Sequence, residues 1–266
     1  MRLSASHNPA SFLGVEIRNI NLADPIDSCD LAALLDHFDY HHLLIVKNQK
    51  LSEEQLINVG NIFGEPAPAL VPTFRLKEYP LITKHSNTKD ENESPMGVVA
   101  PEHVFHADSY FTDNPNKTTL FYSLKSPEQG GETHFVNMCH AYDTLNNETK
   151  KLIDDKKATY KNAYINQPPV SHPLVRVHPV TKRKALFVNI HRALGIDGLE
   201  QNEALNLLKN LYEHATNPEL IYRHKWEDGD LLVWSNVTTM HCATPIDSSQ
   251  ERLLYRILIK GVLPVS

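Results

Sequence analysis

The 266-residue chain lacks several features that would place it in other classes of protein. It has no basic tract, and its 26 Lys and Arg are outnumbered by 32 Asp and Glu, which gives a formal charge of −6. Because nucleic-acid binding depends on clustered positive charge, we predict no nucleic-acid partner. No apolar run approaches the roughly 18 residues of a membrane-spanning helix, so no membrane association is expected.

Cysteine is scarce as well. The three cysteines, Cys29, Cys139 and Cys242, form no spaced framework of the kind seen in disulfide-rich proteins. Residues 1–9 contain no apolar stretch typical of a signal peptide. An odd, sparse set of cysteines suits a reducing compartment, so we predict a cytoplasmic protein. We expect Cys242 to be a small buried residue rather than a catalytic one.

The composition is that of an ordinary globular protein, with 41% hydrophobic and 22% charged residues, and the length suits a single domain over 1–266. Apolar periodicity predicts helices at 30–38, 149–157 and 199–214, and strands at 12–20, 43–46, 118–124, 174–178, 185–190, 231–234 and 252–263. A capping box at 52–55 predicts a further helix that ends at Gly64, and 130–137 is expected to be a tight turn entering a strand. The polar segment 88–95 is expected to be a loop, either a lid or simply solvated. The element order predicts a mostly β fold with flanking helices around a double-stranded β-helix (jelly roll, cupin-like) core.

Two histidines and one aspartate give the strongest chemical signal. His106 and Asp108 are two residues apart, so on a strand both side chains point to the same side. His241 would have to come from a strand that is distant in sequence but adjacent in space, as in a jelly roll. Two imidazoles and one carboxylate are the facial triad that holds non-haem Fe(II) and leaves other positions open. In a chain with 15 His, the His-x-Asp pair alone would be weak evidence.

A second signal is a pair of arginines near the C-terminal end. Arg252, Leu254 and Arg256 would share one face of a strand. A guanidinium group binds carboxylates in bidentate fashion, so two inward arginines beside a metal predict an anionic cosubstrate and an anionic substrate. From the strand pattern alone, two exposed arginines would be an equally good explanation.

Together these segments resemble the taurine/α-ketoglutarate dioxygenase (TauD/TfdA) family, which includes 2,4-dichlorophenoxyacetate dioxygenase. The resemblance runs from about residue 12 to residue 261. The matching segments, in the order of the family, are 106–108 with Phe111 behind them, 130–133, 172–179, 185–189, 229–236, His241, Arg252 and Arg256.

The resemblance implies a role for each of the matching polar residues. His106, Asp108 and His241 would bind Fe(II), and Arg252 and Thr133 would hold the distal carboxylate of 2-oxoglutarate (α-ketoglutarate), the cosubstrate. The family consumes 2-oxoglutarate and O2, releases succinate and CO2, and oxidises an unactivated C–H bond, so either hydroxylation or desaturation is expected. Because the carboxylate ligand Asp108 is present, halogenation is disfavoured.

The resemblance also bears on the small-molecule substrate. Arg256 would hold a substrate carboxylate, Phe111 and Tyr110 would line the pocket, and Arg192 is either a further anion contact or an exposed loop residue. Glu102 stands where taurine-specific members have Asn, and its charge would repel a sulfonate, so taurine is not expected. We expect a small organic acid derived from an amino acid, with an isonitrile amino acid of natural-product biosynthesis as one form. Dimers and tetramers are common in the family, so a homo-oligomer is expected.

Two alternatives belong to other functional classes. A metal-binding jelly roll without turnover could act as a sensor or binding protein, but it would have no need of Thr133 and Arg252. A jelly-roll isomerase or lyase could use the same metal without 2-oxoglutarate. Binding of 2-oxoglutarate to the Fe(II) protein would separate these alternatives from a dioxygenase.

Overall fold

A computed structural model describes residues 3–6, 13–70, 72–92, 94–98, 104–162 and 167–261. Its largest sheet has eight strands in the order β1-β2-β3-β14-β6-β16-β4, and β5 also pairs with β16. All neighbours are antiparallel except β2 and β3. The strands of this major sheet are β1 (Ser4–Ser6), β2 (Val15–Arg18), β3 (Leu43–Val46), β4 (Pro66–Ala67), β5 (Thr83–Ser86), β6 (Thr118–Lys125), β14 (Leu231–Ser235) and β16 (Leu253–Ile259).

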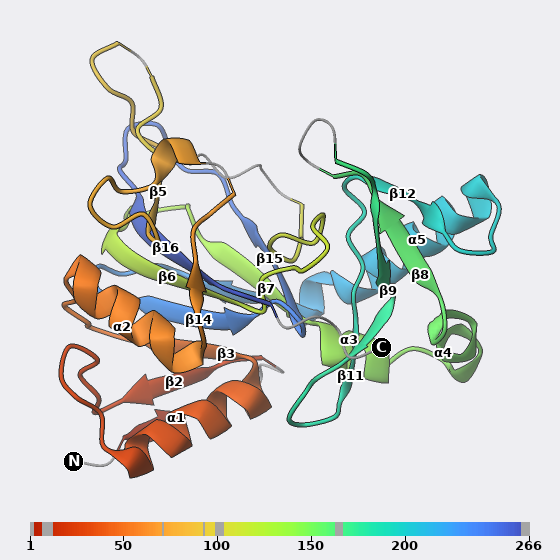
Figure 1. Ribbon diagram of the computed structural model, residues 1–266, viewed down its shortest axis with the longest axis horizontal. Coiled ribbons are helices and arrows are strands. Elements are labelled where there is room, and N and C mark those ends of the chain that lie inside the picture. The colour runs from red at the N-terminus through yellow and green to blue at the C-terminus, as the bar shows by residue number, and fades with distance from the viewer. Residues whose placement is uncertain are drawn as a thin grey trace.

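A smaller antiparallel sheet faces the major one. It contains β13 (Tyr222–His224), β7 (Thr133–Asn137) and β15 (Thr239–Ala243), in that order. An aromatic core joins the two sheets, since the Trp234 ring lies 5.2 Å from Phe121 on the major sheet and 5.3 Å from Phe135 on the smaller one. Two facing antiparallel sheets form the predicted double-stranded β-helix, seen in the left part of Figure 1.

The other face of the major sheet is covered by α1 (Ser28–His41) and α2 (Glu53–Phe63), as Figure 1 shows. Alternation along each strand decides which side chains meet the helices. On β6, Leu120 and Tyr122 pack in the cluster under the helices, whereas Phe121 belongs to the core between the sheets. Burial of an apolar side chain of this size contributes about 1.5–3 kcal/mol, so this alternation favours one strand register strongly.

Helix α2 begins at the predicted capping box. The Ser52 hydroxyl accepts a hydrogen bond from the Gln55 N–H at 3.2 Å, and the Gln55 side chain accepts one from the Ser52 N–H at 2.9 Å. These bonds satisfy N–H groups that have no partner within a first helical turn, and such a cap contributes about 1 kcal/mol.

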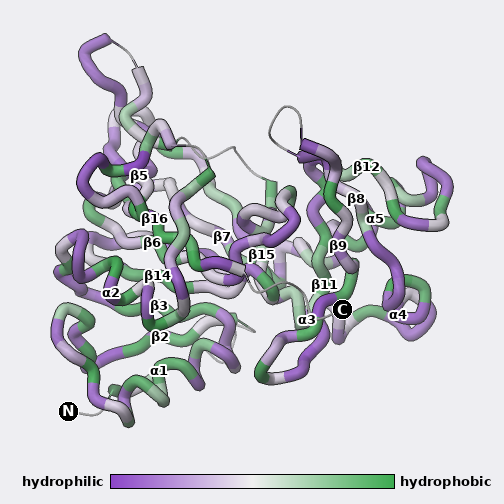
Figure 2. Tube along the Cα trace, in the orientation of Figure 1, coloured by the Kyte–Doolittle hydropathy of each residue, from purple (hydrophilic) through white to green (hydrophobic). Residues whose placement is uncertain are grey.

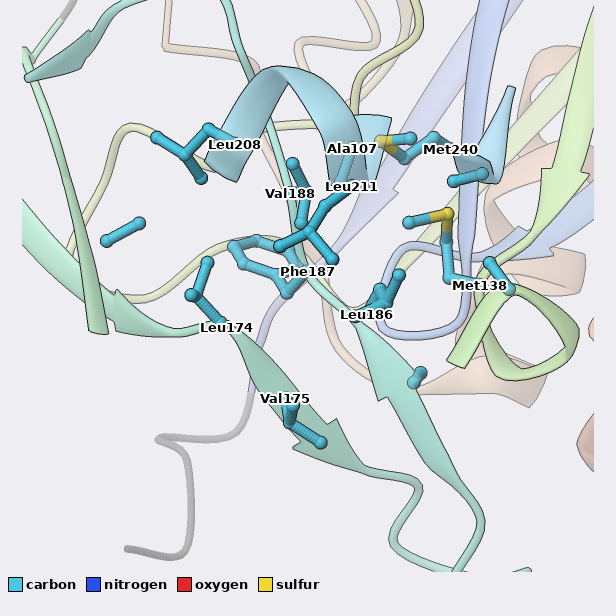
Figure 3. Close-up of a cluster of buried hydrophobic side chains, with 14 of the residues drawn as sticks. Ala107, Met138, Leu174, Val175, Leu186, Phe187, Val188, Leu208, Leu211 and Met240 are labelled. Carbon is cyan, nitrogen blue, oxygen red and sulfur yellow. The ribbon is translucent and has the colours of Figure 1, made fainter. Parts of the chain in front are cut away.

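The segment between β7 and β13 builds a second, partly helical unit, on the right of Figure 1. Its elements are α3 (Met138–Asp143), α4 (Asn147–Ile153), β8 (Lys157–Tyr160), β9 (Val170–Pro173), β10 (Val175–Val177), β11 (Lys184–Leu186), β12 (Ala193–Ile196), α5 (Gln201–Ala215) and the short 3-10 helix at Pro218–Leu220. A second 3-10 helix, Pro72–Phe74, lies outside this unit and precedes β5. A buried cluster that includes Leu174, Phe187, Leu208 and Leu211 fills this unit (Figure 3). We call it the helical-side cluster.

Some element boundaries differ from the prediction. The helix expected over 149–157 ends at Ile153 and Lys157 already begins β8, because a reverse turn with a bond from the Lys156 N–H to the Ile153 carbonyl separates them. The strand expected over 185–190 ends at Leu186. Segment 88–96 closes on itself through bonds from the Met96 N–H to Thr88 and from the Asp90 N–H to Ser94, and its described tip is exposed and hydrophilic (Figure 2). This geometry favours a solvated hairpin over a lid.

Two further expectations concern membrane-spanning helices and the cysteines. Among the residues that the structure describes, no helix is long and apolar enough to cross a membrane. All three cysteines are free, and Cys242 is buried as expected, with burial raising the pKa of its thiol to about 11. A thiol that stays protonated is a poor nucleophile, so Cys242 serves packing.

Candidate active site

The structure brings the three predicted metal ligands together. His106 and His241 face each other as an antiparallel pair, in which the N–H of each donates to the carbonyl of the other at 3.0 and 2.9 Å. Potential ligand atoms of His106, Asp108 and His241 all lie within 4.8 Å of one another, and no other group of three or more His, Cys, Asp or Glu in the described ranges does so. The pairing of His106 with β15 confirms that His241 comes from a strand distant in sequence.

Alternation explains why all three ligands point the same way. Ala107 lies between His106 and Asp108 and packs into the helical-side cluster, as does Met240 next to His241 (Figure 3). The three ligands therefore point away from that cluster. His106 forms an isolated bridge and Asp108 already begins a turn, so the expected short strand ends at the ligands.

A hydrogen bond orients the imidazole of His106. Its Nδ1 lies 3.0 Å from the Val104 carbonyl oxygen, which can only accept, so Nδ1 carries the proton. The lone pair of the neutral ring is then on Nε2, which is left for the metal. Metal-binding histidines commonly have their tautomer set in this way by a partner outside the coordination sphere.

A buried polar network holds Asp108. The hydroxyl of Thr119 donates to Asp108 Oδ2 at 2.6 Å and accepts from Asn236 Nδ2 at 2.8 Å. The Asn236 side-chain oxygen accepts from the Asp108 N–H at 3.2 Å and from the Trp234 indole N–H at 3.1 Å. Every link has a donor and an acceptor, so the carboxylate is fixed from behind.

Asp108 and His241 have the protonation states that a metal requires. Burial alone would raise the pKa of Asp108. The nearby groups His241, Arg256, His106 and the Thr119 hydroxyl lower it by more, so the pKa of Asp108 lies below its ordinary value. Burial, with the neighbouring His106 and Arg256, lowers the pKa of His241 to about 3. The pair is therefore a carboxylate and a neutral imidazole at neutral pH, which are the ligand forms that bind metal.

Arg252 and Thr133 form a second polar position. Arg252 Nη2 lies 3.3 Å from the Thr133 hydroxyl oxygen, which also accepts from the Trp226 indole at 3.0 Å. Arg252 is 7% exposed, and although burial lowers its pKa to about 10 it remains cationic at neutral pH. Within the described part of the chain it has no ion-pair partner, and its Nε has no hydrogen-bond partner.

A buried charge without a counterion costs several kcal/mol, so the Arg252 position fits a ligand anion. The Thr133 hydroxyl already accepts from two groups, which leaves its own proton to donate to the same anion. The predicted site for the distal carboxylate of 2-oxoglutarate therefore has the donors it needs.

Arg256 lies on β16, which begins directly after Arg252, but at the metal end. Its Nη1 is 3.6 Å from Asp108 Oδ1, and its side chain is 17% exposed. The two arginines thus reach inward at two places, one beside Thr133 and one beside a metal ligand, which rules out the alternative of two exposed strand residues.

The contacts of the other residues expected near the substrate are as follows, and their contact with a substrate stays a prediction. Tyr110 is buried in the helical-side cluster, and its hydroxyl donates to the His191 carbonyl at 2.6 Å, so its hydroxyl already has a partner within the protein. Phe111 is half-buried with its ring edge-on to Tyr110 at 5.3 Å. Arg192 is exposed, with its guanidinium 6.0 Å from the Phe111 ring. Glu102 lies outside the described residues.

The sequence alone does not single out Thr119, Asn236 or His85, although Asn236 lies in a matching segment. All three become noticeable only through their spatial neighbours: Thr119 and Asn236 support Asp108, and the charges of Arg252, Arg256, Asp108 and His241 act on buried His85.

Comparison with known proteins places this site in a family. Residues 5–258 match the family described as "Taurine catabolism dioxygenase TauD, TfdA family". The 2,4-dichlorophenoxyacetate dioxygenase of Cupriavidus pinatubonensis is 30% identical over 94% of each chain. A crystal structure named as a taurine dioxygenase of Burkholderia xenovorans has a TM-score of 0.86 at 26% identity, covering 100% of this chain and 93% of its own. AAD-2 in complex with Mn(II) and N-oxalylglycine has a TM-score of 0.87 at 27% identity, with 100% coverage of both chains.

The chain belongs to the TauD/TfdA family, as the sequence predicted. It is an α-ketoglutarate-dependent dioxygenase that uses Fe(II), 2-oxoglutarate and O2. The residues present fit these groups: two histidines and a carboxylate can bind one ion, and buried Arg252 has no anionic partner among the described residues, which 2-oxoglutarate would supply. Because the chain belongs to this family, the two alternative hypotheses, a metal-binding sensor without turnover and a jelly-roll isomerase or lyase, lose their support.

Proposed function

We propose that this dioxygenase oxidises an unactivated C–H bond of a small organic acid, derived from an amino acid, whose carboxylate is bound by Arg256. The observation that carries the proposal is the pair of inward arginines, because they provide two separate positions for anions at one metal centre. One position serves the cosubstrate and the other the substrate.

His106, Asp108 and His241 would hold Fe(II), which when bound supplies O2 activation coupled to decarboxylation of 2-oxoglutarate. Arg252 and Thr133 would orient 2-oxoglutarate by its distal carboxylate. The hydroxyl of Thr119 holds Asp108 in place through its bond to Oδ2, and the other carboxylate oxygen, Oδ1, lies towards Arg256.

Arg256 would fix the orientation of the substrate. It lies four residues beyond Arg252, which is about 13 Å along a strand, and it reaches the metal ligand Asp108. A carboxylate bound there would keep one end of the substrate in place and present a defined C–H bond to the metal. Such positioning converts binding energy into selectivity, since small displacements of a reacting atom are costly.

The relatives support an anionic substrate without naming it. One is named for an aryloxyacetate, which carries a carboxylate, and one for taurine, which carries a sulfonate. Neither name supports an isonitrile amino acid, which therefore enters only as one compound to be tested. The choice between hydroxylation and desaturation, the homo-oligomeric state and the cytoplasmic location stay predictions.

The experiment is a screen of acids, amino acids, their isonitrile derivatives, aryloxyacetates and taurine for succinate release by the Fe(II) enzyme. Arg256→Ala should raise the KM for the best acid by about tenfold to more than a hundredfold, because a charge-assisted hydrogen bond of about 1.5–3 kcal/mol is lost. Arg18→Ala is the matched control, since Arg18 is an exposed arginine paired with Glu16 on β2. A best substrate without an anionic group, or tightly coupled turnover of taurine, would refute the proposal.

A further inference from the structure

His85 occupies a place between the two arginines that the proposed function does not use. It lies on β5, the strand that pairs with β16, directly opposite Leu254. Leu254, on β16, stands between Arg252, which directly precedes the strand, and Arg256, and residues directly opposite each other in an antiparallel pair point to the same face. The His85 imidazole is therefore on the inner face of the sheet with both guanidinium groups.

The surroundings of His85 hold it firmly. Its backbone pairs with Leu254 on one side and forms a bridge with Val98 on the other. Its ring packs 4.9 Å from the ring of Phe121, which lies opposite Arg256 on β6. A side chain fixed by both neighbouring segments and by an aromatic ring is well placed to orient a ligand.

One nitrogen of this ring lacks a partner. His85 is 8% exposed, and its Nε2 is buried without a hydrogen-bond partner among the residues that the structure describes. Burial, followed by the charges of Arg256 and Arg252, lowers the pKa of His85 well below its ordinary value, so the ring is neutral. Buried polar atoms are nearly always hydrogen-bonded, so an unsatisfied nitrogen beside two cations points to a ligand.

We propose that His85 donates a hydrogen bond from Nε2 to the carboxylate of the acid substrate bound by Arg256, and so determines specificity for that carboxylate. This inference rests on the proposed function. A neutral donor suits the place, because Arg252 and Arg256 already provide one positive charge for each of two carboxylates. The cosubstrate carboxylate has Arg252 and Thr133 as donors, and His85 would be the second donor beside Arg256 for the substrate carboxylate.

The test compares His85→Leu with His85→Gln. Leucine fills the space without a polar atom, and the glutamine amide places an N–H near the position of the imidazole Nε2. The protein is loaded with Mn(II) and N-oxalylglycine, and calorimetry measures binding of 2,4-dichlorophenoxyacetate and of the uncharged 2-(2,4-dichlorophenoxy)ethanol. His85→Leu should weaken binding of the acid by about tenfold to a hundredfold, His85→Gln by less than about threefold, and neither should change binding of the alcohol or of N-oxalylglycine.

The possible failures can be told apart. Equal losses for the acid and the alcohol would show a packing role and overturn the proposal, and a loss confined to N-oxalylglycine would assign His85 to the cosubstrate and overturn it as well. If Arg256→Ala weakens binding of the acid and His85→Leu does not, this assignment fails and the proposed function stands. If neither variant weakens it, or if wild type binds neither this acid nor any acid of the screen, the proposed function fails too. Should His85→Leu unfold, His85→Phe provides the apolar variant.

Discussion

Replacing Thr119 by valine would remove one hydroxyl group from the metal centre while leaving the size of the side chain nearly unchanged. The lost hydroxyl donates to Asp108 Oδ2 at 2.6 Å and accepts from Asn236 at 2.8 Å. The change therefore breaks two links of the network that holds the carboxylate and leaves a buried Asn236 N–H without its acceptor.

The expected size of the effect follows from these contacts. A hydrogen bond to a charged group contributes about 1.5–3 kcal/mol, and removing a group that supports a metal ligand typically lowers metal affinity about tenfold to a hundredfold. The unsatisfied Asn236 N–H should lower the free energy of unfolding by about 1–3 kcal/mol. The Thr119 hydroxyl also lowers the pKa of Asp108, so in the variant this carboxylate should take up a proton at a higher pH. As the pH falls, the variant should therefore lose its metal at a higher pH than wild type does.

Anaerobic titration with Fe(II), or Mn(II) binding followed by electron paramagnetic resonance, would measure the affinity. Thr118→Val is the matched control: it is the same substitution one residue earlier on β6, where alternation turns the side chain to the other face of the sheet. If Thr119→Val bound the metal within about twofold of Thr118→Val, the network would not be what positions Asp108.

Three further predictions concern other parts of the molecule. His241→Ala should abolish succinate formation and lower iron affinity while the circular dichroism spectrum is preserved; full activity would contradict the assignment of the ligands. Arg252→Ala should raise the KM for 2-oxoglutarate about tenfold to a hundredfold, and Arg252→Lys should raise it less. Thr133→Val should also raise this KM, but more weakly. If all three variants bound 2-oxoglutarate as wild type does, its distal carboxylate would have to bind elsewhere. His178 is buried, and burial together with the charges of Arg183 and Lys182 lowers its pKa to about 4. Between about pH 6.5, the ordinary pKa of histidine, and pH 4, the unfolded chain therefore binds a proton that the folded protein does not. The contribution of His178 to the free energy of unfolding is present above about pH 6.5 and is lost as the pH falls towards 4. His178→Asn keeps an acceptor at the Nδ1 position, so between pH 7 and 5 wild type should lose about 1–2 kcal/mol more stability than the variant in denaturant titrations; parallel losses would show that His178 is not the group that titrates.

Local patterns along the chain determined much of the fold and of the metal site. The capping box at Ser52 defines the start of α2 because its bonds join residues three positions apart. Strand alternation places His106 and Asp108 on one side with Ala107 on the other, and it turns Arg252 and Arg256 inward together. Such relations depend on spacings of two to four residues, so they can be deduced before any tertiary structure is known.

Contacts between strands that are distant in sequence decided the rest. The sequence contains His85, Thr119 and Asn236, but the pairing of β5 with β16 and of β6 with β14 brings them to the ligands. The same holds for Tyr110, an aromatic residue two positions beyond Asp108, whose hydroxyl is bonded to the His191 carbonyl in the helical-side cluster rather than at the metal. The neighbours of a sheet residue come from separate strands, and which strands pair is set by the packing of the whole core, so only the tertiary structure could assign these residues to the site or to the core.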